Sequence, residues 1–194
     1  PRSPRLRPDT DPLAEAVEAT RRHGMHLLAY INPNAYYDSH PLYESACIRD
    51  EAGQAWDIKA YGIARTRYAC TTHPEFARFY TAAIRELVGE RGAEGIYVDG
   101  LTPHVCYCEH CRAAFRRDTG RDLPAGLTKL GPLCVLWEMT SDWDAVGDVR
   151  NPDHQRYARW LMRRLAEVTR LFAEAARAAR PDAVVVFHSW PKPD

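Results

Sequence analysis

The chain has 194 residues, which is enough for one sizeable hydrophobic core, and its length indicates a single domain. Lys plus Arg and Asp plus Glu both number 26, so the formal net charge is zero. This balance argues against a nucleic-acid partner, because phosphate binding usually leaves a basic excess. No run of ~20 apolar residues occurs, so no membrane-spanning segment is expected.

The first eight residues lack the apolar core of a secretory signal peptide. This favours a cytoplasmic location, although the sequence leaves the compartment otherwise unknown. The chain is expected to begin inside a domain.

The first predicted elements are a helix over residues 12–23 and a strand over residues 26–31. Asp11 can cap the helix, Pro12 suits its first position, and Gly24 ends it. A helix that leads directly into a buried strand is the repeat unit of α/β proteins.

Residues 32–65 are expected to be a long connection with little regular structure, which is usually a functional loop. A strand over residues 67–70 then ends at Cys70. Pro74 begins the clearest helix, whose apolar residues repeat at i, i+3, i+4 and i+7 over four turns. These are Phe76, Phe79, Tyr80, Ala83, Ile84, Leu87 and Val88.

The second half of the chain continues the same alternation. A strand is predicted over residues 95–99, a short helix over 112–118, and a long helix from Asn151 and Pro152 onward. Residues 183–187 form an apolar, β-branched run, as expected for a strand covered on both faces. The pattern predicts an α/β fold of parallel strands with crossover helices.

A cluster of cysteines follows the predicted strand 95–99. Of the six cysteines, Cys106, Cys108 and Cys111 fall within six residues, which is metal-site spacing rather than a dispersed disulfide framework. A structural Zn²⁺ site needs four ligands and leaves no open position. The alternative is a set of reduced cysteines or a disulfide in a loop. Cys47 and Cys134 are expected to be buried thiols.

The fourth zinc ligand has three candidates: Cys70, His104 and His110. Cys70 is favoured because it ends the strand before the Pro74 helix, while the cluster follows the end of the next strand. In a parallel sheet these two strand ends are neighbours at one edge.

Asp99 is the candidate catalytic residue. It ends the apolar strand 96–98, and strand ends at the carboxyl side form the active-site mouth of (β/α) barrels. An aspartate there can be a nucleophile, an acid/base, or a hydrogen-bonding group for sugar hydroxyls. The alternative is a turn, because Asp-Gly is a common turn pair.

Other polar and aromatic side chains fall at strand ends on the same side. They are Tyr30, Asn32, Asn34, His188 and Trp190. Rings stack on sugar faces and amides bind hydroxyl groups, so the set suits a carbohydrate; each residue alone is more often packing or capping. Glu138, Asp142 and Asp144 are unranked candidates for a second carboxylate.

Residues 11–190 resemble the hypothetical glycosyl-hydrolase-like families of (β/α)₈ barrels, especially the one numbered 6. The similar stretches are residues 12–30, 95–100, 106–120 and 142–160. The resemblance implies one partial TIM-type barrel domain over residues 1–194, with a zinc-binding loop at about 104–120. It also implies hydrolysis of O-glycosidic bonds in an unidentified carbohydrate.

The cysteine segment is also similar to that of the family 42 β-galactosidases. This resemblance implies Cys70, Cys106, Cys108 and Cys111 as the ligands of a structural zinc ion. Those enzymes have Asn-Glu near the strand end, where this sequence has Asp99-Gly100, and Thr71-Thr72-His73 also departs from their pattern. The metal site is therefore carried over, and the substrate is not.

A closed (β/α)₈ barrel typically needs ~250 residues, so the chain is expected to be a barrel fragment. It would need either the missing barrel segment or a further copy of itself as a homo-oligomer. Three functions are consistent with these patterns: a glycoside hydrolase, a non-catalytic carbohydrate-binding or inactive barrel fragment, and a zinc-dependent interaction module. The neutral charge and the amphipathic helices around the cysteines argue against the third.

Overall fold

The structure is a computed structural model that describes residues 10–55, 57, 65–101, 104–127 and 151–188. The helices are α1 (Pro12–Arg22), α2 (Pro74–Arg85), α3 (Glu109–Thr119) and α4 (Pro152–Ala179), and a π-helical turn η2 (Glu86–Glu90) continues α2. The strands are β1 (Leu28–Ile31), β2 (Ala35–Tyr37), β3 (Thr66–Tyr68), β4 (Gly95–Val98) and β5 (Val184–Phe187).

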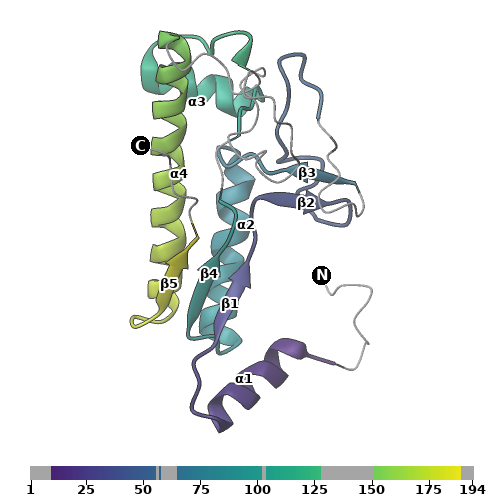
Figure 1. Cartoon of the computed structure of the whole chain (residues 1–194), viewed down its shortest axis with the longest axis vertical. Helices are drawn as coiled ribbons and strands as arrows, with labels where there is room; N and C mark the ends of the chain where they lie inside the picture. Colours follow the sequence, from purple (N-terminus) through teal and green to yellow (C-terminus); the bar gives the residue numbers. More distant parts are fainter. Residues whose placement is uncertain (1–9, 56, 58–64, 102–103, 128–150, 189–194) are drawn as a thin grey trace.

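The central element is a three-stranded parallel sheet in the order β1-β4-β5. Helix α2 lies between β1 and β4 in the chain, and α4 lies between β4 and β5, so both connections are helical crossovers. This confirms the predicted α/β alternation. In Figure 1, α1 lies at one end of the sheet, and the β2–β3 pair and α3 lie beyond the other end, where the strands terminate.

The main core fills the space between one face of the sheet and the helices α2 and α4. Alternate strand residues point to this face, so Ile96 and Val98 of β4 are fully buried together with Phe76 of α2 and Phe172 of α4. The amphipathic pattern predicted for the helix after Pro74 is therefore confirmed. Burial of such apolar side chains is the main source of stability in a domain of this kind.

A second core lies beyond the sheet, between α3 and the first half of α4. It joins Phe115 of α3 to Tyr157 and Trp160 of α4, with the cysteine loop packed against them. Tyr157 and Trp160 are 2% and 1% exposed, so this part of the molecule is as well packed as the main core. The cysteine loop therefore lies in packed protein interior rather than on an exposed arm.

The prediction for residues 32–70 is wrong in two respects. The segment contains a strand, β2, where an irregular loop was expected, and β3 pairs with β2 in an antiparallel sheet rather than joining the parallel one. Further bridges join Cys47 to Ala69 and Arg49 to Ala55. Short strand segments can complete their hydrogen bonds within a local antiparallel pair, and the sequence pattern does not distinguish this from a sheet strand.

Strand β5 also departs from its prediction, because it is not covered on both faces. Val184 is 49% exposed and the rest of β5 is only partly buried, since β5 is one of the two edge strands of the described sheet. The face of the sheet away from α2 and α4 is also open at Tyr30, which is 60% exposed. Among the described helices, none combines the length and the apolar character needed to cross a bilayer.

Candidate functional site

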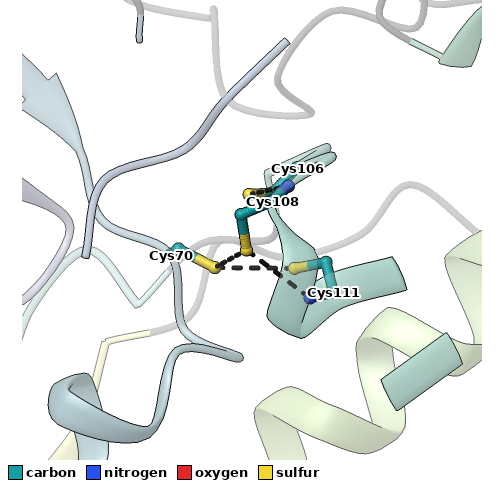
Figure 2. A group of neighbouring side chains, drawn as sticks. All are labelled: Cys70, Cys106, Cys108 and Cys111. Carbon is teal, nitrogen blue, oxygen red and sulfur yellow. Dashed lines mark hydrogen bonds between the residues drawn. The ribbon is translucent and has the colours of Figure 1, made fainter. Parts of the chain in front are cut away.

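Four cysteines from two distant segments converge beyond the ends of the parallel strands. Cys70 follows β3 and precedes α2, while Cys106, Cys108 and Cys111 come from the loop after β4 and the first turn of α3. Figure 2 shows the Cys70 side chain directed toward Cys108 and Cys111. The structure thus brings together the four predicted ligand residues.

The strand that leads to Cys70 is paired differently from the prediction. Cys70 was expected to end a parallel strand adjacent to β4, but β3 belongs to the antiparallel pair. The Cys70 backbone is instead held outside the parallel sheet, where its N–H donates to the carbonyl of Ala46 at 2.8 Å. The antiparallel bridge between residues 46–47 and the segment that follows β3, rather than the parallel sheet, therefore positions this sulfur.

The geometry of the four sulfur atoms fits a tetrahedral metal ion. All four lie within 4.8 Å of one another, and the Cys70 sulfur is 3.7 Å from that of Cys108 and 3.5 Å from that of Cys111. Zinc–sulfur bonds of ~2.3 Å in a regular tetrahedron require sulfur–sulfur distances of about 3.8 Å. These cysteines are free thiols in the structure and 1–8% exposed, so the donor set matches a closed tetrathiolate site.

Backbone N–H groups also favour negative charge on the sulfurs. The Arg49 and Cys108 amides approach the Cys106 sulfur at 3.4 Å and 3.5 Å, and the Cys111 amide approaches the Cys108 sulfur at 3.5 Å. Cys108 is the N-cap of α3, where the helix dipole attracts an anion. These donors are the kind of outer contact that orients thiolate ligands around a metal.

Without a cation, four thiols packed this closely do not all ionise. Hydrogen bonding to Cys106 and Cys108, with burial, raises the pKa of the Cys70 thiol well above its ordinary value, and the same contacts with Cys70 added do so for Cys111. Hydrogen bonds from Cys106 and the other two sulfurs lower the pKa of Cys108. A divalent ion that binds here must therefore displace protons.

The Asp99 carboxylate lies at the end of β4 between side chains from both neighbouring strands. The Tyr30 hydroxyl of β1 donates to one carboxylate oxygen at 2.6 Å, and the His188 Nδ1, just after β5, lies 2.8 Å from the other. The Asp99 side chain is 27% exposed and that of His188 is 39% exposed. The three groups therefore form one solvent-accessible cluster at the carboxyl ends of all three parallel strands.

This environment favours the ionised form of Asp99. The Tyr30 hydrogen bond lowers the pKa of the carboxyl below its ordinary value; partial burial opposes this shift, and the contact with His188 adds to it. Asp99 is thus a carboxylate at neutral pH. A group with these properties suits a nucleophile or a stabiliser of positive charge better than a proton donor.

Tyr97 belongs to the same cluster and was not among the predicted site residues. Its ring stacks against Tyr30, with centroids 5.9 Å apart and an interplanar angle of 14°, and lies 6.3 Å from the His188 ring. Strand alternation places residues 97 and 99 on the same face of β4, which is a signal that could have identified it. The result is an aromatic wall beside the carboxylate.

Asn32 and Asn34 lie at the same edge, where the Asn32 side chain bonds within the turn and the Asn34 side chain bonds to a histidine. The Asn32 Oδ1 accepts from the backbone N–H of Asn34 at 3.1 Å, and the Asn34 Oδ1 lies 2.8 Å from His104 Nε2. The remaining candidates, Trp190, Glu138, Asp142 and Asp144, lie outside the described residues, as does Cys134.

His104, one of the candidates for the fourth ligand, is buried next to the cysteine loop and lies outside the four-sulfur group. It is 5% exposed and stacks on the Tyr68 ring with centroids 4.0 Å apart. Burial lowers the pKa of His104 to about 3, so the ring is neutral at physiological pH. Because an amide oxygen only accepts, the Nε2 atom carries the proton that is donated to Asn34.

No protein-family model matches the sequence, and no curated protein matches it. Solved structures do match. An alpha-L-fucosidase isoenzyme 2 from Paenibacillus thiaminolyticus has a TM-score of 0.65 and 21% identity over 96% of this chain. The alpha-galactosidase TtGalA from Thermus thermophilus, in complex with stachyose, has a TM-score of 0.50 and 12% identity over 90% of this chain.

These similarities concern the fold, because the identities are too low to indicate a shared substrate. The chain corresponds to 23% of the fucosidase chain and 27% of the galactosidase chain, so it spans about a quarter of each. The α/β arrangement described above is therefore one that also occurs in part of known glycoside hydrolases.

Proposed function

We propose that this protein is a glycoside hydrolase that acts on O-glycosidic bonds of a carbohydrate, with Asp99 as its reactive carboxylate. The observation that carries the proposal is the cluster of Tyr30, Asp99 and His188 at the carboxyl ends of three parallel strands. Active sites of (β/α) barrels form at this edge. The shared fold with a fucosidase and a galactosidase supports the same function.

In this proposal Asp99 attacks the anomeric carbon of the bound sugar. A bond forms between a carboxylate oxygen and that carbon while the glycosidic bond breaks, and the departing oxygen takes a proton from a separate acid. Water then hydrolyses the glycosyl–Asp99 ester. The low pKa of Asp99 keeps the attacking group ionised, and candidates for the acid include Glu138, Asp142 and Asp144.

The neighbouring side chains are proposed to bind the sugar. Tyr30 and Tyr97 offer ring surface and, with His188, Asn32 and Asn34, groups that hydrogen-bond to hydroxyls. Trp190 follows β5 and is assigned the same role from its position in the sequence. An apolar ring beside a carboxylate suits a pyranose, which presents one apolar face and several hydroxyl groups.

The four cysteines are proposed to hold Zn²⁺ in a structural role. Four thiolates fill the tetrahedral coordination sphere, so no position remains for a catalytic water. When bound, the ion would crosslink the β2–β3 pair to the loop that follows Asp99. The contribution of this site is therefore to the folding of the carboxyl edge rather than to the chemical step.

The described sheet is proposed to be part of a closed (β/α)₈ barrel. The face that carries Tyr30 and Val184 is open, whereas the inner face of a barrel is filled by side chains from all its strands. Further strands, or a second copy of the chain, would cover it.

Substitution of Asp99 by Asn tests the catalytic assignment. Asn is close in size but is a much weaker nucleophile, so we expect hydrolysis of p-nitrophenyl α-L-fucoside and α-D-galactoside to fall by ~10³-fold or more. Release of p-nitrophenol by the protein and its variants measures the rate. These probes follow the activities named for the two structural neighbours.

The matched control is Asp182→Asn. Asp182 precedes the other end of β5 and is paired with Arg180, far along the strand from Asp99. This variant is expected to retain the rate of the unsubstituted protein. Full activity of Asp99→Asn, with its folding verified by circular dichroism, would refute Asp99 as the reactive group.

A non-catalytic carbohydrate-binding protein is the second candidate function. It is favoured by one observation: the hydrogen-bonded cluster of Tyr30, Asp99 and His188 contains a single carboxylate, whereas glycosidases ordinarily use two. Sugar binding without turnover, in a protein whose Asp99→Asn variant also loses binding, would identify this function.

A further inference from the structure

The turn between β1 and β2, residues 32–34, lies between the cysteine loop and the strand end that carries Asp99. We call it the edge turn. It is only three residues long, and Pro33 at its centre is buried. A short turn with a rigid, buried centre can transmit displacement from one side to the other, because it has few dihedral angles with which to absorb it.

On the metal side, the edge turn is held by groups next to two of the four cysteines. The Ala69 N–H, one residue before Cys70, donates to the Asn34 carbonyl at 2.8 Å. The His104 Nε2, two residues before Cys106, donates to the Asn34 side chain at 2.8 Å. Asn34 is thus joined to both of the chain segments that supply sulfur ligands.

The position of His104 is itself fixed from two sides. Its ring stacks on Tyr68, and its carbonyl lies 3.4 Å from the Tyr157 hydroxyl, which also accepts from the Cys106 amide at 3.2 Å. The same hydroxyl of α4 therefore contacts both His104 and a cysteine of the cluster. A change in the cysteine loop cannot leave the His104 backbone unaffected.

On the carboxylate side, the edge turn packs against the residue that follows Asp99. A Cβ atom at Gly100, whose φ is +72°, would lie only 3.1 Å from both the Asn32 Oδ1 and the Asn34 Cβ. The Asp99 N–H donates to the carbonyl of Ile31, the last residue before the turn, at 2.9 Å. Contact with the turn therefore constrains the backbone on both sides of the Asp99 side chain.

We infer that His104 and Asn34 are positioning residues, through which the metal-bound cysteine loop fixes the strand end that presents Asp99. This inference deepens the proposed function, since it gives the metal centre a role at the carboxylate site. Asn34 then acts mainly through its bond to His104, and its assignment as a sugar-binding residue becomes secondary. The two asparagines of the edge turn connect the metal centre to the carboxylate site.

The test compares amide hydrogen exchange at Ala69 and Asp99 in the zinc-loaded and chelator-treated protein, with and without the substitution His104→Phe. Phenylalanine keeps a ring to stack on Tyr68 and loses the donor to Asn34. In the zinc-loaded protein, His104→Phe should retain one zinc per chain and should accelerate exchange at both amides by up to about tenfold, the effect of one lost hydrogen bond.

The coupling between zinc removal and the His104 substitution is a more specific test than either change alone. Removal of zinc should accelerate Asp99 exchange more in the unsubstituted protein than in His104→Phe, because the variant has already lost the connection. Equal effects of zinc removal in the two proteins, or unchanged exchange at Asp99 in His104→Phe, would overturn the inference. If His104→Phe fails to bind zinc, Asn34→Ala removes the same hydrogen bond from the other partner. Unchanged exchange at Asp99 in Asn34→Ala, or an equal effect of zinc removal in Asn34→Ala and the unsubstituted protein, would then overturn the inference.

The matched control is His26→Phe, which removes a histidine hydrogen bond at the opposite end of the sheet, to Glu94. It should leave exchange at Ala69 and Asp99 unchanged and independent of zinc. None of these measurements uses a sugar. Failure of the glycosidase proposal would therefore leave the exchange results intact, and failure of the coupling would leave the Asp99→Asn result intact.

Discussion

Asp99 is held by donors from two different strands, which distinguishes it from an aspartate that merely forms a turn. A turn-forming aspartate bonds to nearby backbone N–H groups. Asp99 has such a bond to the backbone of Gly100, but in addition one oxygen binds Tyr30, 69 residues earlier in the chain, and the other binds His188, 89 residues later. Side-chain contacts over such separations exist only because the parallel sheet places three strand ends together. This favours the functional interpretation of Asp99 over the turn alternative.

The substitution Tyr30→Phe is expected to raise the pKa of Asp99. The tyrosine hydroxyl donates to the charged carboxylate and is the largest cause of the lowered value, so its loss moves the pKa up toward that of an ordinary aspartate. Titration of the ¹³C carboxyl resonance of Asp99 measures the change directly. Tyr37→Phe, at an exposed tyrosine of β2, is the control and should leave the titration unchanged.

The lowered pKa of Asp99 makes the free energy of unfolding depend on pH. Because the pKa of Asp99 is lower in the folded than in the unfolded chain, the stabilisation is present above the unfolded value and is lost as pH falls through the folded value. Tyr30→Phe should therefore reduce the loss of folding stability that protonation of Asp99 causes at low pH. A carboxyl resonance of Asp99 that titrates identically in both proteins would show that the hydroxyl does not stabilise the charge.

At the residue scale, the sequence indicates which positions carry reactive or polar side chains. It gives much less information about which residues each of these side chains contacts. Strand periodicity locates Asp99, Tyr30 and His188 at one edge, and the structure brings these three together. It does not reveal that Asn34 bonds to His104, because that contact depends on a turn and a loop whose conformations have no periodic signal. Tyr97 could have been found from alternation along β4.

At the scale of elements, the four-cysteine cluster is a junction between two supersecondary units. The β2–β3 pair supplies Cys70, and the loop between β4 and α3 supplies the other three sulfurs. A metal ion at this junction would close a long loop, which restricts the unfolded chain and favours the folded one. The second core around Phe115 and Trp160 packs against the same loop.

The substitution Cys108→Ser is expected to reduce both the bound zinc and the stability of the protein. Serine is a poor zinc ligand, and Cys108 is the sulfur that contacts Cys70 and accepts from the Cys111 amide. Zinc per chain by atomic emission and the urea midpoint of unfolding measure the two effects. Cys47→Ser is the matched control, because Cys47 is buried near the site but lies outside the four-sulfur group.

We expect Cys47→Ser to retain one zinc per chain, whereas Cys108→Ser binds it only weakly. Equal zinc content in the two variants would contradict the tetrathiolate assignment.

The sequence supports this site strongly, since C-x-C-x-x-C spacing constrains three ligands to one loop and helix turn. The sequence could not predict that Cys70 follows an antiparallel strand, because the pairing of β3 depends on tertiary contacts rather than on local pattern.

At the scale of the whole molecule, the described residues form a parallel sheet with helices packed on one face. Helices α2 and α4 cover one face through Phe76 and Phe172, and the other face exposes Tyr30 and Val184. The helix–strand alternation in the sequence is sufficient to predict this parallel architecture. Closure into a barrel is not encoded in any local pattern, because it depends on strand number and on how the last strand meets the first.

The open face and the carboxylate cluster are both features that the proposed carbohydrate-active barrel would have. The strand ends of β1, β4 and β5 provide a carboxylate, two tyrosines and a histidine at one edge. The four-cysteine cluster lies beyond the same edge and is connected to it through the edge turn. The proposed function therefore requires a sugar to bind at this edge.

The most direct test is a titration of the ¹⁵N- and ¹³C-labelled, zinc-loaded protein with L-fucose and D-galactose, followed by NMR. We predict that the largest chemical-shift changes with either sugar occur at Asp99, Tyr30 and His188, with smaller changes along the edge turn and none in α1. Shifts confined to other parts of the molecule, or no saturable shifts with any monosaccharide at the carboxyl edge, would contradict the account.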